Sequence, residues 1–258
     1  MFVTTAGRTN DALIEKAKSI ADEFSVEYIP RRKSSIQAIQ QLRNDDCIVI
    51  GKNRMEMYAF GVKEAFFFHP NSAMFRIKRI IRGEHDPFLQ ACRLKEGDRF
   101  LDCTLGLASD SIVASYAVGN EGEVVGVEGS LYLAYLVKEG LQQWESNVSS
   151  INGAMKKICV IHQQALDFLR NQKSKQFDCI YFDPMFEAQI DDSDGIHALR
   201  RFAIYEDITT ELMDEAMRVA KRRVVIKDHF RSSRFQKYGF QVNVRESAKF
   251  HYGVLEKE

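Results

Sequence analysis

The chain contains 258 residues, and 45% of them are hydrophobic, so it can bury a large core as one large domain or two unequal ones. Its 36 basic and 36 acidic residues cancel, which excludes a strong overall charge bias toward nucleic acid or a membrane surface but permits local patches. No apolar run is long enough to cross a bilayer, and the first residues, MFVTTAGRTND, lack a signal-peptide pattern, so we expect a cytoplasmic protein.

The first 75 residues predict a small N-terminal α/β domain. Alternating apolar runs indicate short strands at MFVTT, VEYIP, CIVIG, MEMYAF and EAFFFH. Helical spacing is found in NDALIEKAKSIADEF and SSIQAIQQLR. Residues 76–96 are predicted to form a helical connection to the remainder of the chain.

Residues 97–258 alternate strand and helix patterns regularly. Short apolar runs typical of buried parallel strands are DRFLDCT, EVVGVEG, KKICVIH, FDCIYFDP and RVVIKD. Helix patterns lie between them, and GFQVNVRES and KFHYGVLEK close the chain as an antiparallel hairpin. The pattern predicts a doubly wound, Rossmann-like α/β fold with a mostly parallel sheet.

The first strand of this domain leads into the turn LDCTLGLASD. Ligands of open parallel sheets bind beyond the carboxyl ends of the strands, where this turn lies. Gly106 permits a close ligand approach, and Asp102 and Thr104 can bond to a polar group. Glu128 ends the second strand, 22 positions after Gly106, which suits the hydroxyls of a ribose. A nucleotide-like cofactor is therefore expected.

The turn has one glycine where dinucleotide sites have G-x-G-x-x-G, and this disfavours NAD and FAD. It favours S-adenosylmethionine (SAM), which has no phosphate to bind but has a charged methionine end that Asp102 can anchor. The scattered cysteines and histidines form no metal-ligand pattern, so no metal is expected, and we interpret the cysteines as reduced core residues.

A second candidate site is the sequence YFDPMFE, where the fourth strand of the large domain ends. Asp183 is predicted to lie on the same sheet edge as Asp102 and Glu128, and Pro184 forces the chain out of the ladder. A carboxylate and freed carbonyls suit an exocyclic amine, and Phe186 can stack on the base that carries it. These residues, Asp183, Pro184 and Phe186, are the predicted catalytic group.

These motifs resemble class I SAM-dependent methyltransferases. Asp183-Pro184-Met185-Phe186 is similar to the D/N-P-P-Y/F motif of amino-group methyltransferases, and with LDCTLGLASDS upstream it resembles the RsmJ-like family. The likeness covers about residues 64–230. It implies methylation of guanine N2 in small-subunit ribosomal RNA. The chain departs from the family pattern at Ala108, at Glu187 and in RGEHD.

The resemblance also implies roles for individual residues. Asp183 would hold the target amine beside the cofactor, Glu128 the ribose, and the amide oxygen of Gln164 the adenine amine. The residues expected to line the methionine end of SAM are Asp102, Thr104, Gly106 and Asp110.

RNA is the expected partner, and three basic clusters could bind its phosphates. They lie at residues 31–33, 76–82 and 218–237, and the second is favoured because it directly precedes the catalytic domain. Residues 187–202 are predicted to be a substrate lid. Solvated surface charge is the alternative interpretation of each cluster.

The sequence as a whole predicts a SAM-dependent N-methyltransferase of a nucleobase amine, with guanine N2 in rRNA as the favoured acceptor. The alternatives are another RNA or a small molecule as acceptor, a non-catalytic SAM- and RNA-binding module, and an NAD-linked oxidoreductase. The oligomeric state stays open.

Overall fold

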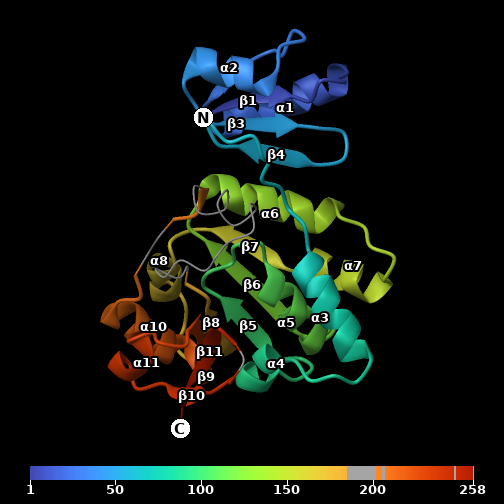
Figure 1. Cartoon of the computed structure of the whole chain (residues 1–258). Helices are drawn as coiled ribbons and strands as arrows, with labels where there is room; N and C mark the ends of the chain where they lie inside the picture. Colours follow the sequence, from blue (N-terminus) through green and yellow to red (C-terminus); the bar gives the residue numbers. More distant parts are fainter. Residues whose placement is uncertain (185–201, 205–206, 247, 258) are drawn as a thin grey trace. The chain divides into compact units, whose positions relative to one another are not determined.

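The computed structural model describes residues 1–184, 202–204, 207–246 and 248–257 (Figure 1). The chain divides into two compact units. The first holds residues 1–69 together with Phe202, and the second begins at Pro70 and holds the other described residues.

The first unit is a small α/β structure around a four-stranded sheet of order β2-β1-β3-β4, in which only β4 runs antiparallel to its neighbour. Its strands are β1 Phe2–Thr5, β2 Glu27–Tyr28, β3 Cys47–Ile50 and β4 Met55–Tyr58. Its helices are α1 Asp11–Glu23 and α2 Ile36–Arg43. Each begins where a polar side chain accepts from the first turn, Asn10 from the backbone N–H of Leu13 and Ser35 from that of Ala38.

The predicted strand EAFFFH is wrong. Only Phe66 pairs, exchanging both backbone hydrogen bonds with Met57 at 2.7 and 2.8 Å in an isolated bridge. Phe66 and Phe68 are buried, so the apolar character of this segment reflects burial of individual rings rather than a continuous strand ladder.

The second unit contains a sheet that, in its described part, has seven strands in the order β10-β11-β9-β8-β5-β6-β7. The parallel strands are β5 Arg99–Asp102, β6 Glu123–Glu128, β7 Cys159–His162, β8 Phe177–Phe182 and β9 Ala220–His229. The antiparallel pair is β10 Gln241–Asn243 and β11 Phe250–Glu256. This confirms the predicted Rossmann-like fold with its terminal antiparallel hairpin.

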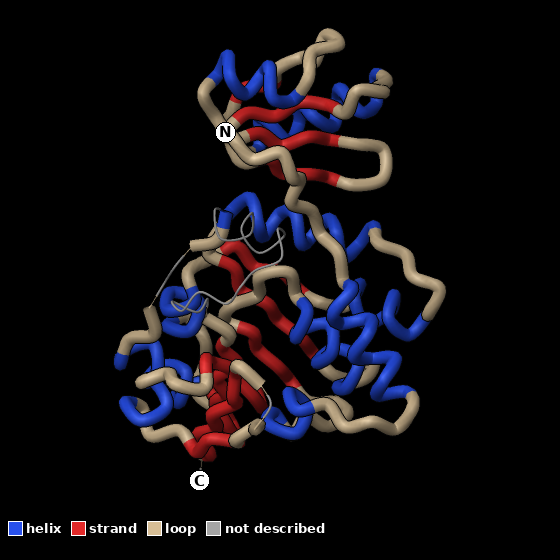
Figure 2. The backbone as a smooth tube through the Cα atoms, in the orientation of Figure 1, coloured by secondary structure: helices blue, strands red, loops and turns tan. Residues whose placement is uncertain are grey.

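Helices cover both faces of this sheet (Figures 1 and 2). In the first layer, α5 Ser109–Val118 packs against α3 Asn71–Ile81, α4 Pro87–Cys92 and α7 Ser149–Lys156, and α6 Leu131–Gln143 packs against α7. Those that share the apolar core of the opposite face are α8 Ala165–Arg170, α10 Thr210–Val219 and α11 Arg234–Lys237. The predicted pattern contains neither the four-residue α11 nor α7, whose eight residues, SSINGAMK, include a glycine and two serines.

Side-chain alternation along the central strands decides which groups face each layer. Tyr181 of β8 packs against Phe88 of α4, with ring centroids 4.9 Å apart, whereas the next residue, Phe182, belongs to the core on the other face. Asp183 follows on the same side as Tyr181. In β5 the same alternation places Asp102 on the α5 side, where it bonds to Ser111.

The sheet order creates a crevice beside β5. The chain runs from β5 outward to β6 and β7, and then returns to the other side of β5 with β8. Parallel α/β sheets bind ligands where the strand order reverses in this way. The residues at that point are Asp102 at the end of β5 and Asp183 just beyond the end of β8.

Candidate active site

The turn that follows β5 forms one part of the site, which we call the cofactor half: Asp102, Thr104, Gly106 and Glu128. Asp102 is 2% exposed, and its carboxylate accepts from the Ser111 hydroxyl at 2.7 Å and from the Thr104 N–H at 3.0 Å. Burial raises the pKa of Asp102 to about 7, although both hydrogen bonds oppose the shift. A cationic group of a ligand beside Asp102 would stabilise the ionised form of this carboxylate, which burial disfavours.

Glu128 holds the glycine turn in place. One of its oxygens accepts from the N–H of Gly106 at 3.1 Å, and the other accepts from the N–H of Ser130 at 2.9 Å. Gly106 has φ +49°, and a Cβ there would meet only the Thr104 carbonyl oxygen at 3.9 Å. A Cβ at this point would therefore meet no close neighbour, and Glu128 lies at the end of β6, as the sequence predicts.

The departure from the family pattern at Ala108 has a conformational consequence. Ala108 adopts the left-handed region at φ 59° and ψ 21°, which glycine occupies at less cost. Directly after it, the Ser109 hydroxyl is buried and has no hydrogen-bond partner among the described residues. An unpaired buried hydroxyl at the start of α5 is a polar group that a ligand in the crevice can satisfy.

Gln164 lies beside the end of β6. A Cβ added to Gly129 would come within 2.8 Å of the Gln164 side-chain oxygen, and the Gln163 N–H donates to the Glu128 carbonyl at 3.1 Å. The glutamine and the carboxylate therefore border the same part of the crevice, an arrangement that suits an adenosine.

The end of β8 forms the second part of the site, which we call the acceptor half: Asp183, Pro184 and Lys227. The Asp183 N–H donates to the Thr104 hydroxyl at 2.6 Å, and this bond joins the two halves. Lys227 of β9 donates to one oxygen of the Asp183 carboxylate at 2.6 Å. Burial raises the pKa of Asp183, and Lys227 counters that shift.

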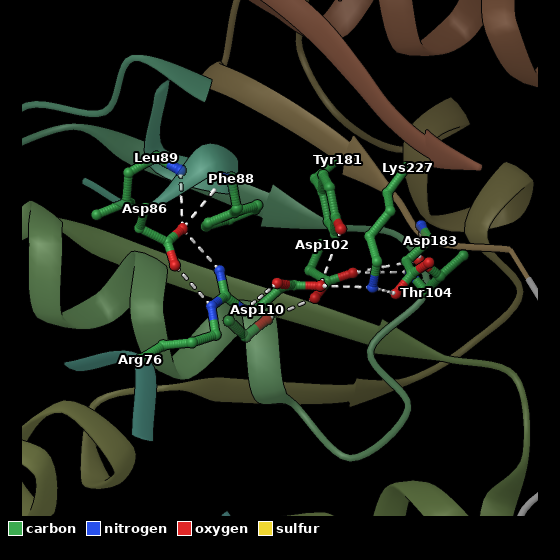
Figure 3. Close-up of polar contacts among 11 residues, drawn as sticks. Arg76, Asp86, Phe88, Leu89, Asp102, Thr104, Asp110, Tyr181, Asp183 and Lys227 are labelled. Atoms are coloured by element: carbon green, nitrogen blue, oxygen red, sulfur yellow. Dashed lines mark hydrogen bonds and ion pairs between the residues drawn. The ribbon is translucent and has the colours of Figure 1, made fainter. Parts of the chain in front are cut away.

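Lys227 continues the network to Asp110 (Figure 3). Its Nζ lies 3.6 Å from an Asp110 oxygen that also accepts from the Tyr181 hydroxyl at 2.8 Å. Burial lowers the pKa of Lys227, but Asp183 and Asp110 outweigh this and hold it above its usual value. The sequence predicts Lys227 only as part of a basic RNA-binding cluster and carries no local signal for this role, which follows from the pairing of β8 with β9.

Arg76 of α3 forms the other end of this network of charges. Its guanidinium bonds to both oxygens of Asp86 at 2.8 and 2.9 Å, and its remaining terminal nitrogen bonds to Asp110 at 2.5 Å. Burial alone would raise the pKa of Asp110, but Lys227 and Arg76 hold it below its ordinary value. The Asp110 carboxylate thus contacts two cations and a tyrosine, and its predicted place at the methionine end of SAM stays a prediction.

Some cations of the predicted basic clusters form ion pairs within the protein. Arg76 has an 18% exposed side chain and pairs with Asp86 and Asp110, which leaves it less available to a phosphate. Several cations of residues 218–237 are also paired, for example Arg222 with Asp98 at 2.5 Å and Arg234 with Asp228 at 3.0 Å. Such contacts between distant residues cannot be read from charge spacing.

Two of the predicted features lie outside the described residues. They are Phe186 and nearly all of the predicted lid, residues 187–202, of which only Phe202 is described. Among the described residues, no group of His, Cys, Asp and Glu side chains has the arrangement of a metal site. In the same part of the chain, no helix combines the length and apolarity that a bilayer span requires.

A family model described as "Putative SAM-dependent methyltransferase" matches residues 34–247. The chain belongs to this family of SAM-dependent methyltransferases. This confirms the enzyme class and SAM as the cofactor, and it contradicts the oxidoreductase alternative.

The chain is also similar to proteins of known sequence and of known structure. The chain is 42% identical over 256 residues, 99% of each chain, to the "Uncharacterized protein YpiP" of Bacillus subtilis. It is 34% identical over 131 residues to the ribosomal RNA small subunit methyltransferase J of Coxiella burnetii, a match that spans 49% of this chain and 48% of that protein. The crystal structure of a SAM-dependent methyltransferase from Neisseria gonorrhoeae superposes with a TM-score of 0.65 over 99% of this chain and 96% of that one, at 16% identity, which shows the shared fold.

The residues present fit this cofactor. The ends of β5 and β6 and the turn between β5 and α5 carry the carboxylates of Asp102 and Glu128, the glycine turn, and the unpaired Ser109 hydroxyl. These groups match a ligand with an amino-acid end and a ribose. It offers no cation beside the turn for a pyrophosphate, since the described cations of the network, Arg76 and Lys227, are already ion-paired with Asp86, Asp110 and Asp183.

Proposed function

We propose that this methyltransferase acts on an exocyclic amine of a nucleobase, and specifically on guanine N2 in ribosomal RNA. The observation that carries the proposal is Asp183, a carboxylate followed by proline at the end of β8, across the switch point from the cofactor half. The likeness to ribosomal RNA small subunit methyltransferase J over half of the chain supports RNA as the substrate class.

The amine would be held by the acceptor half. Lys227 occupies one oxygen of Asp183, so the other oxygen is directed to the substrate together with backbone carbonyls near Pro184. A carboxylate has about four acceptor sites, so the ion pair leaves capacity for two amine protons. Asp183 thereby orients the nitrogen lone pair, and orientation is a major part of the rate enhancement of a transfer step.

The cofactor half would bind SAM, which supplies an electrophilic methyl group on sulfur. Asp102 and the Ser109 hydroxyl face the amino-acid end, Glu128 the ribose and Gln164 the adenine amine. We propose that Asp110 instead acts through Lys227, because its oxygens bond to Arg76 and Tyr181 and lie beside Lys227. Phe186 would stack on the target base.

Proton loss completes the reaction. Once it has accepted the methyl group that SAM would supply, the amine nitrogen would be cationic until it loses a proton. It then gives a proton to Asp183 or to solvent. The raised pKa of Asp183 makes this carboxylate a better proton acceptor than an ordinary aspartate.

The test is to map methylated nucleotides by mass spectrometry in RNA from cells with and without this gene. We expect one guanine N2 position of small-subunit rRNA to lose its methyl group, and the purified enzyme to restore it in vitro. Restoration of the mark by the enzyme on isolated RNA or on assembled subunits would identify the substrate form. An unchanged rRNA profile with a change in another RNA or in a small molecule would select the alternative acceptors.

A further inference from the structure

The sheet edge contains a hollow outside the two halves described above. It has a volume of about 350 Å³, lies between the end of β9 and the β10–β11 turn, and is lined mainly by Phe230, Val244, Arg245, Lys249 and His251. None of these residues contributes to the cofactor half or to the acceptor half.

The hollow adjoins the acceptor half through shared strands. Lys227, which binds Asp183, lies 5.0 Å from the Phe250 ring, and the Arg245 guanidinium lies 4.6 Å from the same ring. Phe230 directly follows the last residue of β9, His229, and Lys227 lies two residues before that end of the strand. A strand whose target base lies at Asp183 could therefore place a neighbouring nucleotide in the hollow.

Phe230 is an exposed aromatic ring that its neighbours hold in position. It is 42% exposed although its ring lies 4.6 Å from that of His229 and 6.1 Å from that of His251, and the Arg231 guanidinium lies 5.0 Å from its centroid. An aromatic ring that is held in place and still partly exposed can stack on a nucleic-acid base. Such stacking depends little on which base is present.

Cations gather around this ring. Arg245 and Lys249 line the hollow against one acidic residue, Glu246, and Arg231 adds a further positive charge at its edge. One terminal nitrogen of Arg245 is buried and has no hydrogen-bond partner among the described residues. Leaving a buried cationic nitrogen without a hydrogen-bond acceptor costs free energy. A phosphate oxygen would serve as that acceptor and would form a charge-assisted hydrogen bond with Arg245.

We propose that this hollow binds the nucleotide adjacent to the target base in single-stranded RNA. Phe230 stacks on its base, and Arg245 with Lys249 binds its phosphate. An aromatic ring beside cations fits single-stranded nucleic acid, because stacking and phosphate contacts together account for sequence-tolerant binding. The inference rests on the proposed RNA substrate, and it adds a subsite that the target amine does not touch.

The stacking part is tested with a short fluorescent single-stranded oligoribonucleotide in anisotropy titrations of the full-length protein. Phe230→Ala should weaken binding by roughly tenfold, the effect of one lost base stack, whereas Phe230→Tyr should bind as the natural protein does. SAM affinity by calorimetry should stay unchanged in both variants, which shows that each is folded.

The phosphate part is tested by the dependence of affinity on salt. Arg245→Gln should reduce the slope of log affinity against log salt by about 1, and Phe230→Ala should leave the slope unchanged. Lys138→Ala is the matched control, since Lys138 is exposed on α6, which packs on β7 at the sheet edge opposite β10. Its loss should have less effect on the slope than that of Arg245.

The outcomes separate this inference from the proposed function. If the natural protein binds the oligoribonucleotide and all the variants bind equally well, the subsite is refuted while an RNA substrate stands. If the natural protein does not bind RNA at all, with or without SAM, both ideas fail. Ultraviolet crosslinking should join the RNA to the peptide that contains Phe230, and a crosslink confined to other peptides also contradicts the subsite.

Discussion

The cofactor half and the acceptor half are held by different kinds of contact. Asp102 and Glu128 accept from N–H groups and a hydroxyl that lie close by, in the turn after β5 and at the start of the following helices. Asp183 is held by the Lys227 ammonium, 44 residues further along the chain, within a chain of charges that reaches α3. The first half is therefore built mainly from backbone geometry, and the second from paired charges.

This difference predicts how each half responds to change. In a site built on backbone donors, removal of one carboxylate should lower the affinity for the ligand only moderately, because the turn itself remains. A site built on buried charges should be sensitive to the loss of any single member, because the remaining charges are left without partners. The following variants test this contrast.

The largest effect is expected for Asp183→Ala. The rate of methyl transfer by this variant should fall by about 10³-fold or more, because no carboxylate then orients the amine or accepts its proton. Calorimetry should give nearly the SAM affinity of the natural protein. Rates are measured with rRNA from cells that lack the gene, and full retained activity on that substrate would refute the catalytic role.

Lys227→Met should destabilise the fold by about 3 kcal/mol, because Asp183 and Asp110 then lie together without their shared cation. The raised pKa of Lys227 means that the ion pair persists until pH rises well above neutral, and it is lost in acid when the carboxylates protonate. Urea unfolding should therefore show a large difference from the natural protein at neutral pH and a small one at acidic pH. An equal difference at both would mean that packing, not charge, is responsible.

Lys221→Met is the matched control for this variant. Lys221 lies on the same strand, is 41% exposed, and approaches Asp178 only to 3.5 Å. Its removal should change the free energy of unfolding by less than about 1 kcal/mol at either pH, as for other exposed pairs.

Glu128→Ala should weaken SAM binding by about 1–3 kcal/mol through unpaired ribose hydroxyls and a looser glycine turn. The contrast predicts that stability changes less here than in Lys227→Met, because the loss of Glu128 leaves two neutral N–H groups, of Gly106 and Ser130, without their acceptor and no unpaired charge. Calorimetry measures the affinity and urea unfolding the stability. An unchanged affinity would mean that the ribose lies elsewhere.

The smallest effect concerns pH. Because burial raises the pKa of Asp102 to about 7, this group is partly protonated at neutral pH, and an ammonium group should bind its ionised form. SAM affinity should therefore fall by roughly tenfold from one pH unit above that pKa to one unit below it. Asp102→Asn should bind more weakly and lose this dependence between pH 6 and 8. A dependence retained by the variant would assign the titration to another group.

Much of the large domain was predictable from its sequence, because the signals are local. Apolar runs bounded by turns gave the parallel strands, and Gly106, Glu128 and Asp183 were expected at the strand ends where they lie. The prediction failed at EAFFFH, where aromatic rings are buried one at a time, and it omitted α7, whose composition is poor for a helix.

The sequence by itself determined the order of strands and helices, the polar groups at the strand ends and the likeness to a methyltransferase family. Each of these depends on residues close together in the chain. The tertiary structure alone decided the pairing of Lys227 with Asp183, the burial of Arg76 between Asp86 and Asp110, and the hollow beside Phe230. These features depend on which strands become neighbours in the sheet, and a list of charges does not contain that information.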